Sequence, residues 1–436
     1  MFETLKNMFV VKDIRKKILY TILIILLFRI GTFITVPGIN KLAFMEAVDA
    51  QAGGILGTIN IISGGAFNRL SIFAMTISPY ITASIVLNLL QTVIPSLERL
   101  AKEGETGKQK LGKYTKLLTV AFAVVEAIGL YLNYKSYLLP SMSYGIYQVV
   151  GMVLFVVCLT AGTALLMWLA DKITENGIGN GVSMIIFVGI VSGAPSAMTA
   201  LAEFAAIRKL NMLIVAGVVI AFVALLAGVI FVQQAERRIP VNYAKRVVGR
   251  KMYGGQNTHI PLKLAMAGVM PIIFAMSFMM IPATIIQLVT KGAATGFWGL
   301  VLKVCSASTE SIWYLVAYAV VYMILIVMFT FVYTMFTVNP VEMSNNLKQN
   351  GGFIPGIRAG KNTADYINKV LKNITWAGAL FLALVAVLPV ACQAAMPGLA
   401  ISFGGTTILI VVSVALETLK TIESQMVSRH YDGFLD

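Results

Sequence analysis

The chain has 436 residues, of which 58% are hydrophobic and only 12% are charged, and its mean hydropathy is +0.84. Soluble domains carry about a quarter of their residues as charged side chains, so this composition excludes an ordinary soluble protein. The formal net charge of +15 must then reside in the few polar segments.

Apolar runs of about 20 residues recur along the chain, and each is long enough to cross a hydrocarbon core about 30 Å thick. We therefore predict an all-α polytopic membrane protein. The first run, Ile18 to Val36, is too long for the apolar region of a signal peptide, and no cleavage motif follows it, so no cleavable signal is expected. The predicted spans number ten and centre near Ile25, Ser84, Val125, Val157, Val191, Val223, Ser277, Ile324, Ala383 and Val414.

One segment between spans and one of the spans themselves are unusual. Between the first and second spans lies "NIISGGAFNRLSIF", Asn60 to Phe73, which is too apolar for an ordinary surface loop. It is also too short to cross a bilayer, because Gly64–Gly65 and Asn68–Arg69 interrupt it. The fifth span, around Val182 to Met198, is predicted to be short and to end in "SGAPSA".

Three polar segments carry much of the positive charge. The first, Glu98 to Lys116, is predicted to be a basic loop. The second, 233–263, combines alternating "RIPVNYAKRVV", typical of a strand, with "YGGQN", which is predicted to be the turn of a hairpin. The third, 339–372, contains the turn cluster "GGFIPGIRAG" around Arg358 and a helix predicted to have Thr363 as N-cap. Basic projections of this kind meet acidic partners, either a phosphate backbone or an acidic protein surface.

The distribution of cations predicts the orientation. With the N-terminus in the cytoplasm, 26 of the 34 lysines and arginines lie in cytoplasmic segments and seven lie on the other side. Cytoplasmic loops are enriched in Lys and Arg, so both termini are predicted to be cytoplasmic. Ten spans divide into two halves of five, and an odd-numbered half inverts the next, which is the layout of an inverted repeat.

The spans themselves contain few groups for chemistry. Arg29 and Glu126 are the main ionisable residues inside spans, and we expect them to pair as structural glue; Glu417 lies near the end of the last span. The three cysteines form no disulfide or metal pattern, and no catalytic or nucleotide-binding motif is present. We therefore expect a protein that is not an enzyme and that has no cofactor and no metal.

Seven long motifs follow one another along the chain: "SGGAFNRLSIFAMTISPYITASI", "KEGETGKQKLGKYTK", "TENGIGNGVSMIIF", "ERRIPVNYAKR", "QNTHIPLK", "NNLKQNGGFIPGIRAG" and "FGGTTILIVV". Together and in this order they resemble the bacterial SecY family, the central subunits of the Sec protein-translocation channel. The resemblance runs from the first span to the C-terminus.

The resemblance implies a fold of two inverted five-helix halves, 1–205 and 206–436, around an hourglass pore. It also implies that the segment at about 57–70 folds back as a short plug helix. The glycines permit such a reversal, and shallow apolar contact is expected to hold the plug. The plug residues implied are Asn60, Ile61, Ile62, Ser63, Gly64, Gly65, Phe67, Asn68 and Arg69.

The resemblance also places a pore ring, a lateral gate and a docking surface on this sequence. The ring is Ile81, Ile85, Val182, Ile186, Ile273 and Ile410, with Val182 standing where isoleucine is frequent in the family. The lateral gate between the second and seventh spans includes Leu87, Leu90, Ser277 and Ile281. The residues implied for partner docking are Arg237, Arg238, Lys245, Arg246, Arg250 and Arg358.

The function implied is a passive protein-conducting channel in the bacterial cytoplasmic membrane. It would pass unfolded polypeptides across the membrane and release hydrophobic segments sideways into the lipid. Its implied partners are SecE-like and SecG-like subunits, the SecA motor ATPase, the ribosome with its RNA, signal sequences, nascent chains and membrane lipids.

Two other readings stay open on the residues alone. A secondary transporter would fit the inverted layout, but it needs a charged or polar mid-membrane pair facing a cavity. A membrane-anchored nucleic-acid binder would use the basic loops. Sequence does not distinguish which clients are preferred, which partner dominates or what the oligomeric state is.

Overall fold

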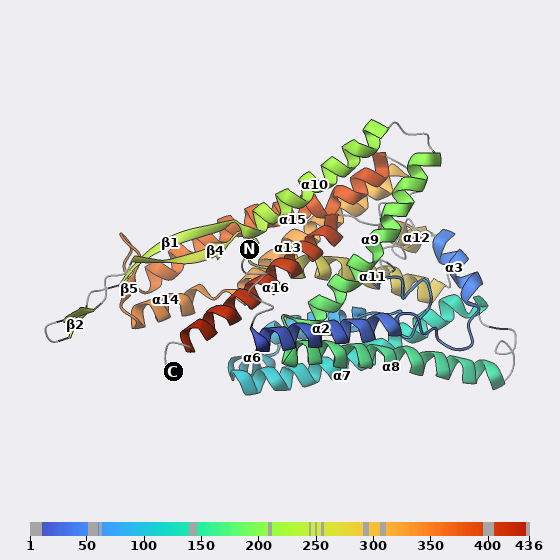
Figure 1. The fold of residues 1–436 in the computed structure, drawn as a ribbon, viewed down its shortest axis with the longest axis horizontal. Helices are drawn as coiled ribbons and strands as arrows, with labels where there is room; N and C mark the ends of the chain where they lie inside the picture. Colours follow the sequence, from blue (N-terminus) through green and yellow to red (C-terminus); the bar gives the residue numbers. More distant parts are fainter. Residues whose placement is uncertain are drawn as a thin grey trace. The chain divides into compact units, whose positions relative to one another are not determined.

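The computed structural model describes residues 11–50, 60, 63–137, 139, 146–207, 212–243, 246–248, 251–253, 257–290, 296–305, 311–395 and 405–432. These residues are mainly helical, with a small amount of antiparallel sheet (Figure 1). The elements in chain order are α2 (Lys12–Gly31), α3 (Lys41–Ala50), α5 (Ser78–Val93), α6 (Pro95–Lys102), α7 (Glu105–Tyr134), η1 (Lys135–Tyr137), α8 (Ile146–Asn176), α9 (Gly181–Ile207), α10 (Met212–Gln234), β1 (Glu236–Tyr243), β2 (Arg246–Val248), β3 (Lys251–Tyr253), β4 (Asn257–Lys263), α11 (Met270–Thr290), α12 (Gly296–Cys305), α13 (Ile312–Thr337), α14 (Pro340–Gln349), β5 (Gly352–Phe353), α15 (Lys361–Ala395) and α16 (Gly405–Asp432).

Helices occupy the positions of the predicted spans. Each of the ten predicted span centres lies in a helix, and these helices are α2, α5, α7, α8, α9, α10, α11, α13, α15 and α16. Among the described residues, four helical stretches are by themselves long and apolar enough to cross a membrane: Thr106–Tyr137, Tyr147–Asn176, Ile312–Gln349 and Lys361–Ala391. The bent pair Ser78–Gln91 and Pro95–Ala101 counts as a fifth if it forms one span.

The end predicted for the fifth span is wrong. Helix α9 does not stop at "SGAPSA" but continues through Pro195 to Ile207. It begins where the Oδ1 atom of Asn180 accepts hydrogen bonds from the backbone of Val182 and Ser183, as an N-cap residue does. A proline inside a membrane helix removes one backbone hydrogen bond, but packing and local adjustment allow the helix to continue.

The described chain divides into two compact units. One comprises residues 1–210, 276–318 and 389–436, and the other comprises 211–275 and 319–388. These units do not coincide with the predicted halves, 1–205 and 206–436. The halves are defined by the inverted order of the spans, which a division by compactness does not test, and they stay a prediction.

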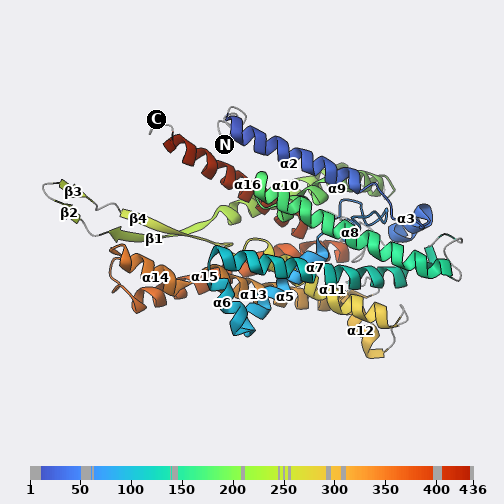
Figure 2. The same cartoon turned by 90° about the horizontal axis from the view of Figure 1, so that it is seen from below.

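The first unit is a helical bundle. In it α7 packs against α5 and α8, and α8 also contacts α2 and α9, so that α2, α7 and α8 run alongside one another (Figure 2). On α2 the side chains of Ile24 and Phe28 are buried, whereas Leu23, Leu26 and Ile30 are more than half exposed. Apolar stripes of this extent on the outside of a bundle indicate a lipid-facing surface.

The second unit contains a small sheet joined to helices. Strand β1 pairs with β4 along its length, from Glu236 opposite Lys263 to Asn242 opposite Asn257, and with β5 at Asn242 and Tyr243. Figure 1 shows this sheet beside α14 and the start of α15. Its inner face packs on those helices through one apolar cluster of buried residues, Ile239, Val241, Leu262, Leu347, Ile354, Ile367 and Leu371. Strands β1, β4 and β5, helix α14 and the start of α15 therefore form one structural module, here called the cytoplasmic module after its predicted side. It joins parts of the two basic segments, 233–263 and 339–372.

Two predicted details of the loops are wrong. The hairpin was predicted to turn at "YGGQN", but Tyr253 is in β3 and Val248 pairs with Lys251, so the chain reverses between β2 and β3. Residues 254–256 of "YGGQN" lie outside the described residues. Segment 98–116 is largely helical rather than a loop, because only Glu103 and Gly104 separate α6 from α7.

The predicted N-cap of the helix after Arg358 is also wrong. Helix α15 begins at Lys361, two residues before Thr363. The Thr363 hydroxyl instead donates a 2.9 Å hydrogen bond to the carbonyl oxygen of Arg358 and is buried. Thr363 therefore holds the turn that precedes the helix.

Candidate functional site

The chain between α3 and α5 enters the first unit as a series of turns. Of its described residues, Asn60 is helical and 63–77 form consecutive turns apart from a bridge at Ser71. This return segment pairs with the chain that leaves α2: Thr35 bridges Ser71, and the Val36 amide donates a 3.0 Å hydrogen bond to the Leu70 carbonyl. The segment is thereby fixed against the end of the first predicted span.

Hydrogen bonds within the segment close it into a compact loop. The backbone N–H of Asn68 donates to the Oδ1 atom of Asn60 over 3.0 Å, and that of Phe67 donates to the Ser63 hydroxyl over 3.1 Å. Gly64 and Gly65 have φ angles of 63° and 82°, a region that side chains other than glycine rarely adopt. These positive φ angles fit the predicted reversal at the two glycines. The predicted plug helix is wrong for the described residues 63–70, which form turns. Ile61 and Ile62 lie outside the described residues.

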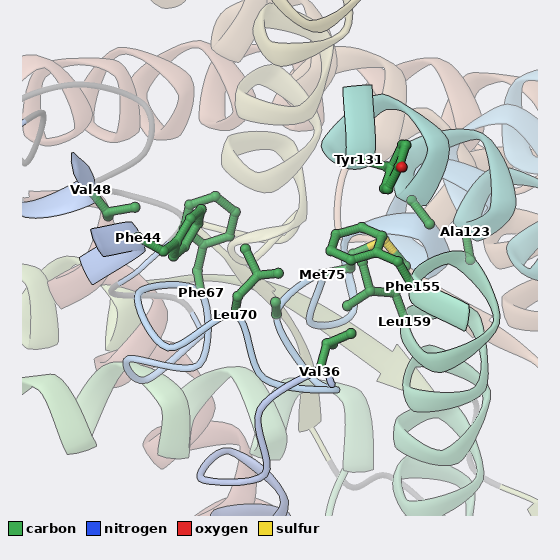
Figure 3. Packing of buried hydrophobic residues seen from close by; sticks show 12 residues of the cluster. Val36, Phe44, Val48, Phe67, Leu70, Met75, Ala123, Tyr131, Phe155 and Leu159 are labelled. Atoms are coloured by element: carbon green, nitrogen blue, oxygen red, sulfur yellow. The ribbon is translucent and has the colours of Figure 1, made fainter. Parts of the chain in front are cut away.

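The expectation of shallow apolar contact is wrong. Phe67 is only 1% exposed, and its ring meets the rings of Phe44 and Tyr134 edge-on at centroid distances of 6.1 and 6.3 Å. Leu70 is buried in the same cluster, which also contains residues of α7 and α8 (Figure 3). The segment is thus held by a core of aromatic and aliphatic side chains.

A close backbone approach adds to this packing. A Cβ atom built on Gly162 of α8 would lie 1.8 Å from the carbonyl oxygen of Ile72. Only glycine allows the return segment to lie so close to α8, in the way that small residues allow membrane helices to pack.

The expected pairing of Arg29 with Glu126 is wrong. The Nη1 atom of Arg29 donates 3.0 Å hydrogen bonds to the carbonyl oxygen of Gly64 and to the Ser192 hydroxyl. Glu126 interacts instead with the side chain of Ser78 at the start of α5. Each charged residue therefore has its own local partner.

The second arginine of this region, Arg69, packs on an aromatic ring. Its guanidinium lies 4.3 Å from the centroid of Phe33, and that of Arg29 lies 5.9 Å from the same centroid. Arg69 is half-buried, as is its neighbour Asn68.

The predicted ring residues lie on four helices. Ile81 and Ile85 are on α5, Val182 and Ile186 on α9, and Ile410 on α16. Ile85, Ile186 and Ile410 are buried, and Ile81 and Val182 are half-buried. Helix α9 packs against α16 in the first unit. Ile273, on α11, belongs to the second unit, so the ring as a whole stays a prediction.

The predicted gate residues lie on α5 and α11. Leu87 is buried, Leu90 and Ser277 are half-buried, and Ile281 is 39% exposed. Pro282 follows Ile281 inside α11. A proline within a helix is a common cause of a bend. The role of these four residues as an exit also stays a prediction.

The described docking residues lie in the basic segments 233–263 and 339–372, on different elements. Arg237 and Arg238 are exposed on β1, where the Arg238 Nε atom lies 2.8 Å from a carboxylate oxygen of Glu236. Arg358 is exposed in the turn between β5 and α15, and Arg246 lies in β2. Lys245 and Arg250 fall outside the described residues.

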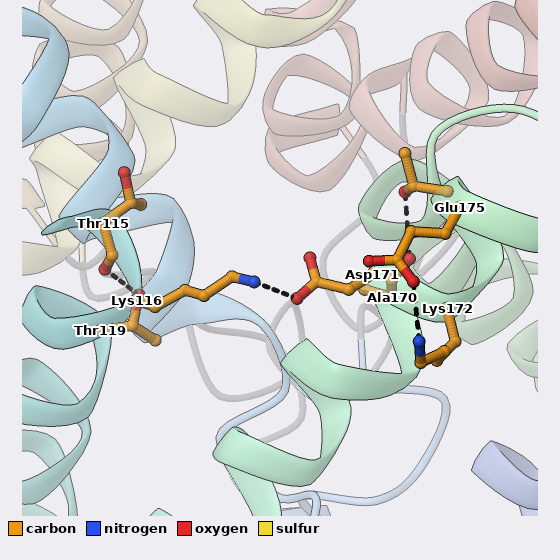
Figure 4. A network of polar contacts seen from close by, with 8 residues as sticks. Thr115, Lys116, Thr119, Ala170, Asp171, Lys172 and Glu175 are labelled. Atoms are coloured by element: carbon orange, nitrogen blue, oxygen red, sulfur yellow. Dashed lines mark hydrogen bonds and ion pairs between the residues drawn. The ribbon is translucent and has the colours of Figure 1, made fainter. Parts of the chain in front are cut away.

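One cation of the segment 98–116 is neutralised by a neighbouring helix. Lys116 of α7 forms an ion pair with Asp171 of α8, and Lys172 pairs with Glu175 over 2.7 Å one turn along α8 (Figure 4). This network joins two helices, so Lys116 is better placed for structure than for docking.

The chain is similar to known proteins along its whole length. The SecY family model matches residues 71–419. The protein translocase subunit SecY of Halalkalibacterium halodurans is 44% identical over 448 residues and covers 100% of both chains. That of Streptomyces coelicolor is 44% identical over 444 residues with the same coverage.

Two solved structures share the fold. One is a SecY structure from work on how the plug domain stabilises the closed state of the translocation channel. It matches this chain with a TM-score of 0.67 at 18% identity, over 95% of this chain and 93% of that chain. The other, Sec61 in the canine ribosome-channel complex of the endoplasmic reticulum, has a TM-score of 0.61 at 17% identity with the same coverage. The family match, the full-length identity and the shared fold together show that this chain belongs to the SecY family of multi-pass membrane proteins.

Proposed function

We propose that this protein is the pore-forming subunit of a protein-conducting channel. It passes unfolded polypeptides across the membrane and releases hydrophobic segments sideways into the lipid. The observation that carries the proposal is the return segment, 63–77, which is non-helical yet buried among helices α3, α7 and α8. Backbone of this kind is tolerated at membrane depth only where protein covers it or it lines a cavity. A plug that closes a polypeptide pore would be covered by protein on one side and would line the pore on the other.

The relatives support this function. The two bacterial proteins that are 44% identical to the whole chain are named as protein translocase subunits. A subunit of this kind provides a path and does not catalyse a reaction. A secondary transporter would instead need an ionisable mid-membrane pair for its substrate or ion, and Arg29 is already engaged by the return segment.

The proposed pore has three working parts. The ring of Ile81, Ile85, Val182, Ile186, Ile273 and Ile410 narrows the path with aliphatic side chains, which exclude water and ions. The return segment, as the plug, closes it a second time. Leu87, Leu90, Ser277 and Ile281 line the lateral exit.

The energy for transport comes from a partner that docks on the cytoplasmic module. Exposed Arg237, Arg238 and Arg358 suit an acidic protein surface or a phosphate backbone. We propose SecA and the ribosome as these partners, and the canine relative in a ribosome-channel complex supports the second. Small SecE-like and SecG-like subunits complete the assembly. The bias of basic residues supports a location in the bacterial cytoplasmic membrane with both termini in the cytoplasm.

The test is reconstitution. Vesicles containing the full chain with SecE-like and SecG-like subunits receive SecA, ATP and an unfolded precursor with a signal sequence. We expect the precursor to become protected from added protease, and we expect no protection without SecA. If the same vesicles concentrate a small solute along an ion gradient but never protect the precursor, the protein is a transporter and the proposal fails.

A further inference from the structure

The return segment is bound to two helices through one arginine. The Nη1 atom of Arg29, in the last turn of α2, donates to the carbonyl oxygen of Gly64 and to the hydroxyl of Ser192 on α9, each over 3.0 Å. The Ser192 hydroxyl in turn donates a 2.7 Å hydrogen bond to the carbonyl oxygen of Gly189. A single guanidinium therefore connects α2, the plug and α9.

The space around Gly64 is as narrow as these hydrogen bonds require. A Cβ atom on Gly64 would lie 2.6 Å from the Ser192 hydroxyl, 2.8 Å from the Arg29 Nη1 atom and 3.1 Å from the Gly189 Cα atom. The adjacent Gly65 has nothing within 4 Å of the same position. Gly64 is therefore seated in a cradle formed by α2 and α9, whereas Gly65 points away from it.

The chemistry of the contact makes it stronger than an ordinary backbone hydrogen bond. A bond from a charged donor is about twice as strong as one between neutral groups. The two acceptors, a carbonyl and a hydroxyl, leave the charge of Arg29 unneutralised. The oxygen of Gly64 is thus held by a full positive charge in a partly buried site.

We propose that Arg29 is a positioning residue that latches the plug between α2 and α9. This inference rests on the proposed channel function and concerns how its plug is held. Moving the plug outward breaks the bond from Arg29 to Gly64. Moving α2 away from α9 breaks the bond from Arg29 to Ser192 and opens the cradle. The latch therefore links displacement of the plug to separation of these two helices.

The latch predicts the resting behaviour of single channels in a planar bilayer. With the full chain and its small subunits, Arg29→Met should open spontaneously at least about tenfold more often than the parent, because the variant loses both charged hydrogen bonds and one alone is worth about that factor. Arg29→Lys keeps the charge and a donor and should restore most of the closed time. Arg15→Met removes one positive charge from an exposed position of the same helix, α2, and should have a much smaller effect.

A pair of glycine variants tests the cradle separately. Gly64→Ala and Gly65→Ala impose similar backbone strain, because both residues have positive φ. Only the first places a methyl group against Ser192 and Gly189, so we expect Gly64→Ala to raise the opening frequency far more than Gly65→Ala. Equal effects of the two variants overturn the latch, and this pair decides the matter if Arg29→Met does not fold.

The deletion of residues 60–67 separates failure of the latch from failure of the channel function. If the deletion raises resting conductance while Arg29→Met stays as tight as the parent, the plug is real and the latch is wrong. If Arg15→Met opens as often as Arg29→Met, the effect is one of net charge and the latch is again wrong. If the deletion itself is as tight as the parent, the plug is not a seal, and the proposed function loses its main support.

Discussion

Tyr243 in β1 pairs with Gly352 in β5, and this pairing joins two basic segments that are far apart in the sequence. A Cβ atom on Gly352 would lie 3.0 Å from the Tyr243 ring and 3.3 Å from a methyl group of Leu347. Position 352 therefore has room for glycine but little room for a larger residue. Because β5 leads directly into the turn with Arg358, this contact also sets where Arg358 stands.

Replacing Gly352 should loosen the cytoplasmic module. Gly352→Val forces the Tyr243 ring or β5 to move, and overpacking of this kind costs about 1–3 kcal/mol. We expect faster hydrogen exchange across residues 340–372 and weaker SecA-driven transport, with normal membrane insertion. The control is Phe353→Val at the neighbouring exposed position of the same strand. Unchanged exchange in Gly352→Val would show that β5 does not hold the turn.

Reversing the charge of Arg358 should block transport without unfolding the protein. Arg358 is exposed and its backbone is held by Thr363, so the side chain can change while the turn keeps its shape. Losing a charge pair that is desolvated on docking costs about 2–5 kcal/mol. The assay is SecA-dependent transport of a precursor into vesicles with Arg358→Glu, with Arg358→Lys as the conservative control. Near-normal transport by Arg358→Glu would remove this residue from the docking surface.

A cross-link between α5 and α11 should lock the lateral exit. We expect a cysteine pair at Leu87 and Ile281, or one turn away on either helix, to form an oxidative or chemical cross-link in the resting channel. The cross-link should stop both transport and membrane insertion, and reduction of an oxidative link should restore them. Each single cysteine serves as the control. The exit lies elsewhere if every cross-linked pair transports as well as the reduced form.

Removing both seals should make the resting channel leak. Deletion of residues 60–67 removes Phe67 from its aromatic cluster and should raise resting conductance in a folded, transport-competent channel. Ile410→Asn places a polar side chain at a buried position of the predicted ring, which should hydrate it and admit defective signal sequences. Single-channel conductance of the combined variant is the decisive measurement. A combined variant as tight as the parent would end the pore assignment.

Much of the fold could be predicted because membrane spans have a simple signature. Length and apolarity placed all ten predicted span centres within helices, since a bilayer requires about 20 apolar residues per crossing. The strand pattern around Ile239 and Val241 was equally readable, because one face of β1 is buried and the other exposed. Element ends were harder to predict, as α9 shows by continuing through Pro195.

The partners of polar residues could not be predicted from the sequence. Arg29 and Glu126 are the obvious ion pair by charge, yet a backbone carbonyl and two hydroxyls satisfy them. Every residue has a backbone carbonyl oxygen, so the sequence does not single out that of Gly64 as the partner of Arg29. The single arginine within an apolar span was the available signal, and it indicated importance without indicating a target. The depth at which Phe67 is buried depends on α3 and α7 together, which no local pattern records.

Helix α15 runs from the cytoplasmic module into the predicted ninth span as one continuous helix, with Pro389 near its far end. It has 35 residues and is therefore about 52 Å long. Ile367 and Leu371 anchor its first turns in the core of the module, and Gly378 lies so close to the chain after β4 that a Cβ atom there would be 2.4 Å from the Leu264 carbonyl oxygen. A helix clamped in this way behaves as a lever. We therefore expect a partner that pushes on the module to deliver mechanical work directly to the transmembrane helices, with the stiffness of α15 setting how much of the stroke arrives.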